Sequence, residues 1–582
     1  MAKVEHNRTS TELSSALTSC RSGLLSLAVF SCFSNLLMLT GPLFMLQVYD
    51  RVLTSGSIPT LLALAALVAV LYAVYGILEF IRSRLLVRVG RIVNDGLRER
   101  VFDAVAVQAM RGAGVRSEPL SDLQTIRQFL QSSGPLAFLD MPWAPVYLAL
   151  IFAMHSLLGY ASLVAAVLLA IIAALNEHVT RKDALESHKA TLQANALSDQ
   201  ARTNIEAATV LGMVGQLRRR WAAMQAKALD SQTRASDRGG LLSGLSRTLR
   251  LVFQSAILGL GAYLAVKREI SPGAMIAASI LMSRALAPVE QAVGQWPQFQ
   301  GFVRSWKRLK EFLAATPPRQ PRMQLPRPSG RIAVENLSAF VQGVEKPIIG
   351  NVSFALAAGE GLGIIGPTGA GKSTLARALV GVWPLTRGTV RFDGATPDQW
   401  DPDILGQSIG YLSQESELFD GTVAENISRF AADPDPQAIV RAAQLADIHE
   451  LLLEMPDGYN TVIGHGGRRV SAGQRQRIGL ARALYGEPTL VVLDEPNANL
   501  DAGGEVALVR AIAQVRQRGG TVLVIAHRPS AIASLDKLMV LKDGKVAAFG
   551  PKDEILSKVL ARPVDGSGRP GGLTVITDNR SP

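Results

Sequence analysis

Six apolar stretches in the first half of this 582-residue chain constrain its fold more than any other feature. A helix that crosses a bilayer needs about 20 largely apolar residues. The stretches cover residues 24–48, 60–81, 143–155, 158–175, 251–266 and 274–295. The third is short, so we expect its helix to begin earlier, within residues 134–141. We predict an α-helical transmembrane domain with six spans in contact with lipid, and a tight external turn between the third and fourth spans.

Lysine and arginine are distributed unevenly among the connections between these stretches. Long, arginine-rich connections cover residues 82–127 and 181–250, whereas those near Asp50, His155 and Lys267 are short and nearly neutral in net charge. Cytoplasmic connections of membrane proteins carry an excess of Lys and Arg. We therefore expect both termini and both long connections to be cytoplasmic.

Composition excludes several other classes of protein. The formal net charge of +12 could indicate nucleic-acid binding, but the arginines of the long connections account for it and no nucleic-acid motif appears. We expect no nucleic-acid partner. The two cysteines, Cys20 and Cys32, are too few for a metal site or a disulfide framework. The first apolar stretch is too long for a cleavable signal peptide and leads into further spans.

A glycine-rich loop in the second half fits the pattern G-x-x-x-x-G-K-[ST], the P-loop. It lies between the strand-like residues 362–365 and the helix-like residues 375–380, which is the context that this motif requires. The glycines allow backbone N–H groups to surround phosphates, Lys372 can reach the β- and γ-phosphates, and the Ser373 hydroxyl can bind Mg²⁺. The candidate nucleotide-binding residues of the loop are Gly366, Pro367, Thr368, Gly369, Ala370, Gly371, Lys372, Ser373 and Thr374.

Four further residues fit the hydrolysis of a nucleotide. Asp494 and Glu495 follow an apolar strand, where Asp494 can hold Mg²⁺ through water and Glu495 can polarise the attacking water. Gln414 can contact both the metal and that water, and His527, at the end of another strand, can contact the γ-phosphate. A lone His or a lone Asp-Glu pair is usually structural, but the complete ordered series favours an ATPase.

The order of these motifs resembles the nucleotide-binding domain of ABC transporters, an α/β P-loop NTPase fold, over about residues 332–560. Ser471-Ala472-Gly473-Gln474 resembles the signature motif of that family, and residues 498–501, which end at Asp501, resemble its D-loop. The resemblance implies that Ser471, Gly473, Gln474 and Asp501 serve a nucleotide held by the P-loop of a second subunit. A homodimer that binds ATP and Mg²⁺ is therefore expected.

Three positions depart from the pattern of the family. Val341 occupies the place of an aromatic residue that stacks on adenine, with Phe340 beside it, so base selectivity is expected to be loose. Ala472 replaces a glycine of the signature, and it would be strained if that position required a positive φ. His465 replaces a glutamate before the signature, which could alter coupling to the membrane domain.

The membrane half resembles the ABC exporters of type I secretion, which export proteases, lipases and repeat-in-toxin proteins. The resemblance runs from about residue 14 to residue 560. It implies a six-span domain of the ABC exporter type in the inner membrane of a Gram-negative bacterium. The implied partners are a periplasmic adaptor (membrane fusion protein), an outer-membrane channel protein and an unfolded secreted substrate with a C-terminal signal. The resemblance rests on MLQVYDRV at 45–52, DLQTIRQFL at 122–130, FLDMPWAP at 138–145, RALAPVEQ at 284–291 and DEPNANLD at 494–501.

Two alternative functions remain open at this stage. A lipid or drug half-exporter would share most of these features, and an adjacent gene for a periplasmic adaptor would distinguish it. A membrane-anchored ATP-dependent sensor or regulator is the second alternative, although Glu495 and six full spans argue against it. Some relatives carry a peptidase-like domain before the first span, and with roughly 20 residues there in this sequence we expect none.

The expected domain organisation follows from these features. Residues 1–20 form a polar cytoplasmic segment, 21–313 the transmembrane domain, 314–330 a proline-rich linker, 331–560 the nucleotide-binding domain and 561–582 a disordered tail. Within the last span, Arg284 and Glu290 would be costly next to lipid. We expect both to line the substrate path, with Pro288 bending the helix between them. The alternatives are that both pair within the bundle, or that the span is shifted and Glu290 lies at the cytoplasmic surface.

Overall fold

The structure is a computed structural model that describes most of the chain in two compact units. The first unit covers Met1–Ala106 and Arg116–Pro318, the second covers Val107–Val115 and Arg319–Pro582, and each is described by itself. The N-terminal segment before residue 15, the middle of the linker and the tail from residue 561 lie outside the described residues, so those predictions are not examined. The described residues are 15–16, 18–110, 118–318, 325–340, 347–383, 385–464, 467, 469–526 and 528–560.

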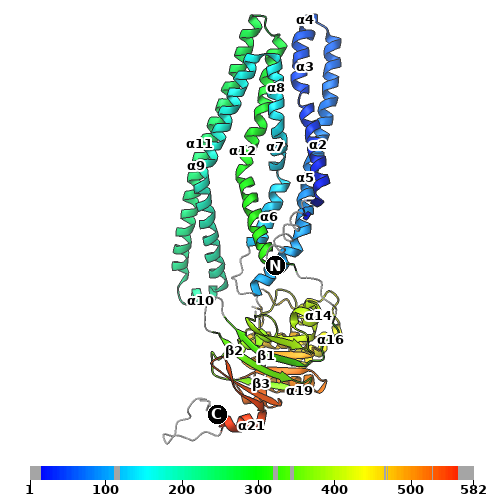
Figure 1. The fold of residues 1–582 in the computed structure, drawn as a ribbon, viewed down its shortest axis with the longest axis vertical. Helices are drawn as coiled ribbons and strands as arrows, with labels where there is room; N and C mark the ends of the chain where they lie inside the picture. Colours follow the sequence, from blue (N-terminus) through cyan, green and yellow to red (C-terminus); the bar gives the residue numbers. More distant parts are fainter. Residues whose placement is uncertain are drawn as a thin grey trace. The chain divides into compact units, whose positions relative to one another are not determined.

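The first unit is built from helices long and apolar enough to cross a membrane, which confirms the predicted six spans (Figure 1). The third begins at Gly134, within the predicted range, and His155 alone separates it from the fourth, as the expected tight turn requires. The candidate spans are Arg21–Ser55, Ile58–Met110, Gly134–Met154, Ser156–Thr203, Val214–Val266 and Pro272–Ala315.

Several of these helices extend well beyond their apolar stretches, and two candidate spans are interrupted. The third span contains a 3-10 turn next to Pro142 and Pro145, because proline cannot donate a helical hydrogen bond. Helices α9 and α11 pack side by side along their length (Figure 1). The elements are α2 (Arg21–Leu37), α3 (Thr40–Gln47), the π-helix η1 (Val48–Val52), α4 (Leu53–Ser55), α5 (Ile58–Met110), α6 (Glu118–Gln131), α7 (Gly134–Asp140), the 3-10 turn η2 (Met141–Trp143), α8 (Ala144–Met154), α9 (Ser156–Thr203), α10 (Ile205–Val210), α11 (Val214–Val266) and α12 (Pro272–Ala315).

A buried polar network joins helices α2, α5, α7 and α8. Arg82 of α5 is 2% exposed, and its Nη2 lies 2.9 Å from both carboxylate oxygens of Asp140 in α7. Asn35 of α2 donates to Asp140 at 2.7 Å and accepts from the Tyr147 hydroxyl of α8 at 3.1 Å. Charged groups within membrane helices pair with one another because isolated charges are costly there. This network therefore holds the interrupted third span against the first two.

Polar contacts also join the short connections between spans, those near Asp50, His155 and Lys267. Asp50 accepts hydrogen bonds from the Ser271 hydroxyl at 2.5 Å and from the Gly273 backbone at 2.8 Å, and so caps the start of α12. His155 Nε2 lies 3.2 Å from Glu269 Oε2. Charged or polar side chains thus join the third short connection to the first and to the second.

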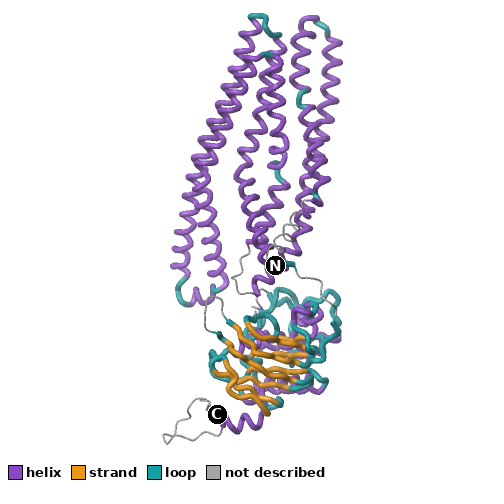
Figure 2. The backbone as a smooth tube through the Cα atoms, in the orientation of Figure 1, coloured by secondary structure: helices purple, strands orange, loops and turns teal. Residues whose placement is uncertain are grey.

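The second unit contains two sheets, which Figure 2 shows in orange. The smaller is antiparallel with the order β2-β1-β4, and the larger has the order β5-β6-β7-β3-β8-β9, parallel except for the pairing of β8 with β9. The strands are β1 (Ile332–Ala339), β2 (Ile349–Leu356), β3 (Gly361–Ile365), β4 (Arg387–Phe392), β5 (Ile409–Leu412), β6 (Leu490–Asp494), β7 (Thr521–Ile525), β8 (Lys537–Lys542) and β9 (Lys545–Pro551).

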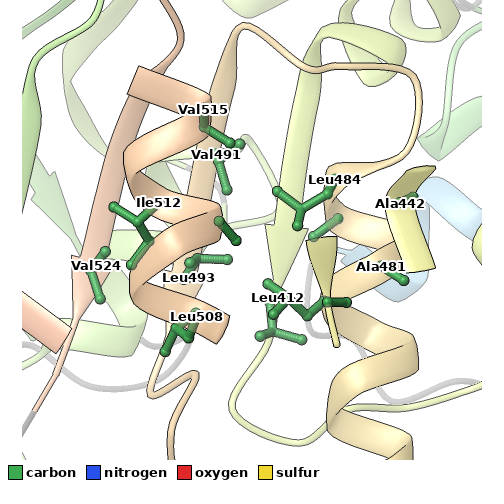
Figure 3. Packing of buried hydrophobic residues seen from close by; sticks show 14 of the residues in the cluster. Leu412, Ala442, Ala481, Leu484, Val491, Leu493, Leu508, Ile512, Val515 and Val524 are labelled. Atoms are coloured by element: carbon green, nitrogen blue, oxygen red, sulfur yellow. The ribbon is translucent and has the colours of Figure 1, made fainter. Parts of the chain in front are cut away.

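Helices cover the larger sheet and bury its central strands. Every residue of β6 and β7 is buried, as expected for parallel strands packed on both faces. Figure 3 shows Val491 and Leu493 of β6 near Leu508 and Ile512 of α19, with Leu484 of α18 on the other side. The helices of this unit are α13 (Lys372–Leu379), η3 (Pro397–Gln399), α14 (Pro402–Ser408), α15 (Val423–Ile427), α16 (Pro436–Leu445), α17 (His449–Leu453), η4 (Gly458–Asn460), α18 (Ala472–Leu484), α19 (Ala502–Gln517), α20 (Pro529–Ile532) and α21 (Lys552–Leu560).

Candidate nucleotide-binding site

The site residues meet at one edge of the larger sheet because of its strand order. The adjacent strands β5, β6, β7 and β3 run parallel, so their carboxyl ends share an edge. Ligands of open α/β sheets bind at that edge. The P-loop follows β3, Asp494 ends β6, and Gln414 comes shortly after β5. Residue 527 follows β7, but His527 itself lies outside the described residues, so its predicted contact stays a prediction.

The P-loop curves around the amino group of its own lysine. Gly369 and Gly371 have φ values of +82° and +92°, which L side chains rarely adopt, and Gly371 precedes the first residue of α13. Lys372 is 6% exposed, and its Nζ donates to the carbonyls of Gly366 and Pro367 at 2.9 and 3.0 Å. Burial lowers the pKa of Lys372, and the charges of the two carboxylates after β6 partly oppose that shift. A buried cation bonded only to carbonyls is suited to accept a polyphosphate.

Ser373 and Asp494 form a pair of oxygen ligands next to this lysine. The Ser373 hydroxyl donates to Asp494 Oδ1 at 3.2 Å. Asp494 is 1% exposed, and among the described residues its Oδ2 has no hydrogen-bond partner. Burial raises the pKa of Asp494, whereas the Ser373 hydrogen bond lowers it. An orphaned buried carboxylate oxygen beside a hydroxyl fits a divalent cation, which would supply the missing partner.

Glu495 is held in an unusual backbone conformation at the end of β6. Its φ is +50°, and its backbone N–H donates to the carbonyl of Ile525 in β7 at 2.9 Å. A positive φ at a residue other than glycine is uncommon and occurs often at functional sites. Its Oε2 accepts a hydrogen bond from Gln414 Nε2 at 3.2 Å. The structure therefore brings together two residues that are 81 positions apart in the chain.

The signature residues form the capped start of α18. The Ser471 hydroxyl accepts from the Gln474 backbone at 3.2 Å, and the Gln474 side chain accepts from the Ser471 backbone at 2.9 Å. Ala472 is the first helical residue and does not have a positive φ, so the predicted steric cost does not arise. Within the described residues, no hydrogen bond joins positions 471–474 to the P-loop.

Sequence reasoning missed two residues of α18 that support the site. The Gln476 side chain donates to the Glu495 carbonyl at 3.2 Å and accepts from the Asn499 backbone at 3.0 Å. Arg477 donates to Asp501, the predicted D-loop residue, which also caps α19. The bond from Arg477 and the Gly504 backbone bond both lower the pKa of the Asp501 carboxyl, the backbone bond more strongly. The only feature of the sequence that could have indicated their role is that Gln476 and Arg477 come shortly after the signature motif.

Two of the departures from the family pattern cannot be placed. Val341 and His465 lie outside the described residues, and the loose base selectivity and altered coupling predicted for them stay predictions. The neighbouring Phe340 is described, and its carbonyl accepts from the Trp383 indole at 3.4 Å.

A P-loop, a hydroxyl–carboxylate pair suited to a cation and a carboxylate bonded to a glutamine lie at one sheet edge and define a P-loop ATPase. The same chain has six helices long and apolar enough to cross a membrane. Comparison with known families agrees with this class. Residues 24–289 match the ABC transporter transmembrane region, and residues 349–498 match the ABC transporter family.

Curated relatives narrow the family further. The type I secretion system ATP-binding protein PrsD of Rhizobium meliloti (strain 1021) is 45% identical over 547 residues, which are 94% of each chain. The cyclolysin secretion/processing ATP-binding protein CyaB of Bordetella pertussis is 29% identical over 91% of this chain and 75% of its own. The leukotoxin translocation ATP-binding protein LktB of Mannheimia glucosida is 27% identical over the same shares.

A solved structure of a bacterial Atm1-family ABC exporter with ATP bound resembles the whole fold. The TM-score is 0.77, and the match covers 92% of this chain and 96% of that one, at 21% identity. This likeness shows the fold alone. With the relatives above, the chain belongs to the ABC transporters of type I secretion. It is an ATPase and a multi-pass membrane protein.

Proposed function

We propose that the chain exports an unfolded protein across the inner membrane of a bacterium, driven by ATP hydrolysis, as a homodimeric ABC component of a type I secretion system. The observation that carries the proposal is the 45% identity to a type I secretion ATP-binding protein over 94% of both chains. We propose that residues 21–313 form the path of the substrate across the membrane and that residues 331–560 form the ATPase.

Within the ATPase, each residue at the sheet edge has a proposed role. Lys372 and the backbone N–H groups of the P-loop bind the β- and γ-phosphates, and Ser373 and Asp494 hold Mg²⁺, which neutralises charge that develops on the phosphates. Glu495 polarises the attacking water and accepts its proton. Gln414, bonded to Glu495 at 3.2 Å, positions that water. His527 contacts the γ-phosphate.

The dimer is proposed because the signature and the P-loop of one chain do not meet among the described residues. The Ser471 hydroxyl and the backbone of Gly473, at the N-terminal end of α18, present partial positive charge suited to a γ-phosphate. We propose that this end binds a nucleotide held by the P-loop of another chain. Two chains, each supplying a P-loop to one site and a signature to the other, would form two equivalent sites.

The partners of the proposed exporter follow from its class. A periplasmic adaptor and an outer-membrane channel protein would continue the path beyond the inner membrane. The substrate would be an unfolded polypeptide with a C-terminal signal. The names of CyaB and LktB, which refer to the secretion or translocation of a toxin, support a polypeptide substrate.

Transport into inverted membrane vesicles tests the proposal. A polypeptide with a C-terminal signal from the same genomic neighbourhood should become protected from protease only when ATP is supplied. Vesicles with Lys372→Ala, which retains the membrane domain, serve as the control and should protect none. ATP-dependent accumulation of a lipid or drug, with no protection of polypeptide, would contradict the proposal.

A further inference from the structure

One exposed face of α5 changes abruptly from apolar to basic. Seven exposed residues recur every three or four positions and so lie on one side of the helix. The apolar stretch ends about one helical turn before the first arginine. From the middle of the helix onward, the face consists of Val70, Val74, Ile77 and Phe80, followed by Arg84, Arg88 and Arg91.

The first two arginines of this face are not neutralised by the protein. Within the described residues, neither Arg84 nor Arg88 has an acidic partner, and the Arg84 guanidinium instead lies 5.1 Å from the centre of the Phe80 ring. Arg91 is paired with Asp95 at 3.3 Å. Arg82, on the other side of the helix, is buried with its own carboxylate partners. The cluster formed by Arg84 and Arg88 is thus available to an external anion.

The start of α2 adds positive charge at the same level of the bundle. Cys20 Sγ lies 3.8 Å from the carbonyl of Val89, and a Cβ on Gly23 would lie 3.2 Å from the Val89 side chain. Helices α2 and α5 run side by side there (Figure 1). The first turn of α2 contains no acidic residue, and Arg21 is exposed. Arg21 therefore adds a positive side chain at this level of the bundle.

We propose that Arg84 and Arg88 bind the headgroup phosphate of an anionic phospholipid, in the membrane leaflet at the basic end of this face of α5. The acyl chains of that lipid lie along the Val70–Phe80 face. The assignment rests on the switch from apolar to basic residues on one face, which matches the succession of acyl chains and phosphate along a lipid. Guanidinium groups pair with phosphate in a bidentate geometry, which favours arginine at such a site.

Lipid retention tests the proposal with the full chain. The protein is placed in bilayer discs of phosphatidylcholine with a minority of phosphatidylglycerol, extracted into detergent, and its bound lipids are quantified by mass spectrometry. The test variant is Arg84→Gln/Arg88→Gln. The control is Arg218→Gln/Arg220→Gln, which removes two exposed arginines of α11 and the same net charge.

We expect wild type and control to retain phosphatidylglycerol in preference to phosphatidylcholine. The test variant should bind it about 25-fold more weakly, the product of about fivefold for each arginine near an anionic surface. Millimolar inorganic phosphate should not displace the lipid, because it lacks the acyl chains. ATP hydrolysis in detergent should match wild type, which verifies folding.

Three results would overturn the proposal. The first is equal retention of phosphatidylglycerol by the wild type and the test variant, and the second is equal retention of both lipids by the wild type. The third is evidence that a second copy of the chain, and not lipid, covers this face of α5. Val87→Cys in a Cys32→Ser background would then form a disulfide-linked dimer in membranes in high yield, whereas a lipid-covered face gives none.

Discussion

Glu495 combines a left-handed backbone with a side chain bonded to Gln414 at 3.2 Å, and its charge is close enough to the P-loop to oppose the fall in the pKa of Lys372. Glu495→Gln should lower ATP hydrolysis by about 10²-fold or more, because a general base is lost while the phosphate-binding groups remain. Nucleotide binding should persist. Steady-state hydrolysis and retained nucleotide measure the two effects.

The matched control is Glu487→Gln, an exposed residue with a similar φ of +54°. It should leave hydrolysis unchanged. If Glu495→Gln hydrolysed ATP near the wild-type rate, the carboxylate would not be the base.

Asp494 illustrates a residue kept for binding at a cost to stability. Burial raises its pKa, so the ionised form destabilises the folded state at neutral pH when no cation is bound. Without nucleotide and divalent cations, Asp494→Asn should therefore raise the thermal midpoint at pH 8 by a few degrees. An acid with a raised native pKa takes up its proton more readily in the folded state, so wild type gains stability as pH falls through that pKa.

The advantage of Asp494→Asn should consequently shrink between pH 8 and pH 5, as followed by intrinsic fluorescence on heating. Asp543→Asn, at an exposed turn, should show no such trend. A lower midpoint for Asp494→Asn at every pH would mean that the carboxylate stabilises the empty site.

At the scale of elements, α12 shows how its charged residues are accommodated. Glu290 Oε1 lies 3.3 Å from Arg250 Nε of α11. For Glu290, this contact favours the alternative that it pairs within the bundle over the prediction that it lines the substrate path. Both side chains are between a quarter and a third exposed, so the pair is worth less than a fully buried one. Arg250→Glu or Glu290→Arg alone should lower the thermal midpoint by a few degrees, and the double exchange should restore most of it. Additive losses in the double variant would exclude the pairing.

Arg284 remains a candidate for the substrate path. It is exposed in the single chain, and its Nη1 lies 3.8 Å from Sδ of Met38, the residue that follows α2. In a Cys32→Ser background, Arg284→Cys should react with a membrane-impermeant thiol reagent in the resting transporter and react several-fold more slowly with a stalled substrate. Glu290→Cys, the comparison, should react more slowly throughout. Lipid-like inaccessibility of Arg284→Cys together with normal export would rule out its role on the path.

At the scale of the whole molecule, the proposed dimer can be tested with two variants, one altered in the P-loop and one in the signature. In a dimer of one chain of each kind, both substitutions would fall on the same nucleotide site. Chains with Lys372→Ala and chains with Ser471→Arg should each fail to trap nucleotide with orthovanadate. Coexpressed, they should form mixed dimers with one site free of both lesions, and trapping should return at that site. The control is the homodimer of each variant, purified in the same way. Absence of trapping in purified mixed dimers would contradict a site shared between chains.

Much of the architecture follows from the sequence because its causes are local. The length of an apolar stretch predicts a span, since a bilayer has a fixed thickness. The P-loop, Asp494, Glu495 and Gln414 could be named because each lies at or shortly after the end of an apolar strand, and parallel strands deliver their carboxyl ends to one edge. The polar halves of α9 and α11 lack an apolar stretch, so the sequence indicated only a long connection there. Only the structure shows that both helices continue through these residues.

The contacts that hold these parts together were decided by tertiary structure alone. Arg82 meets Asp140, Arg250 meets Glu290, and Gln476 bridges Glu495 and Asn499, over separations of 19 to 58 residues. A single sequence shows which side chains carry charge or hydrogen-bonding groups, but not which of them share a level and a face. The rotation and depth of each helix depend on the packing of all its neighbours, so the partner of a buried charge is fixed only when the whole bundle is assembled.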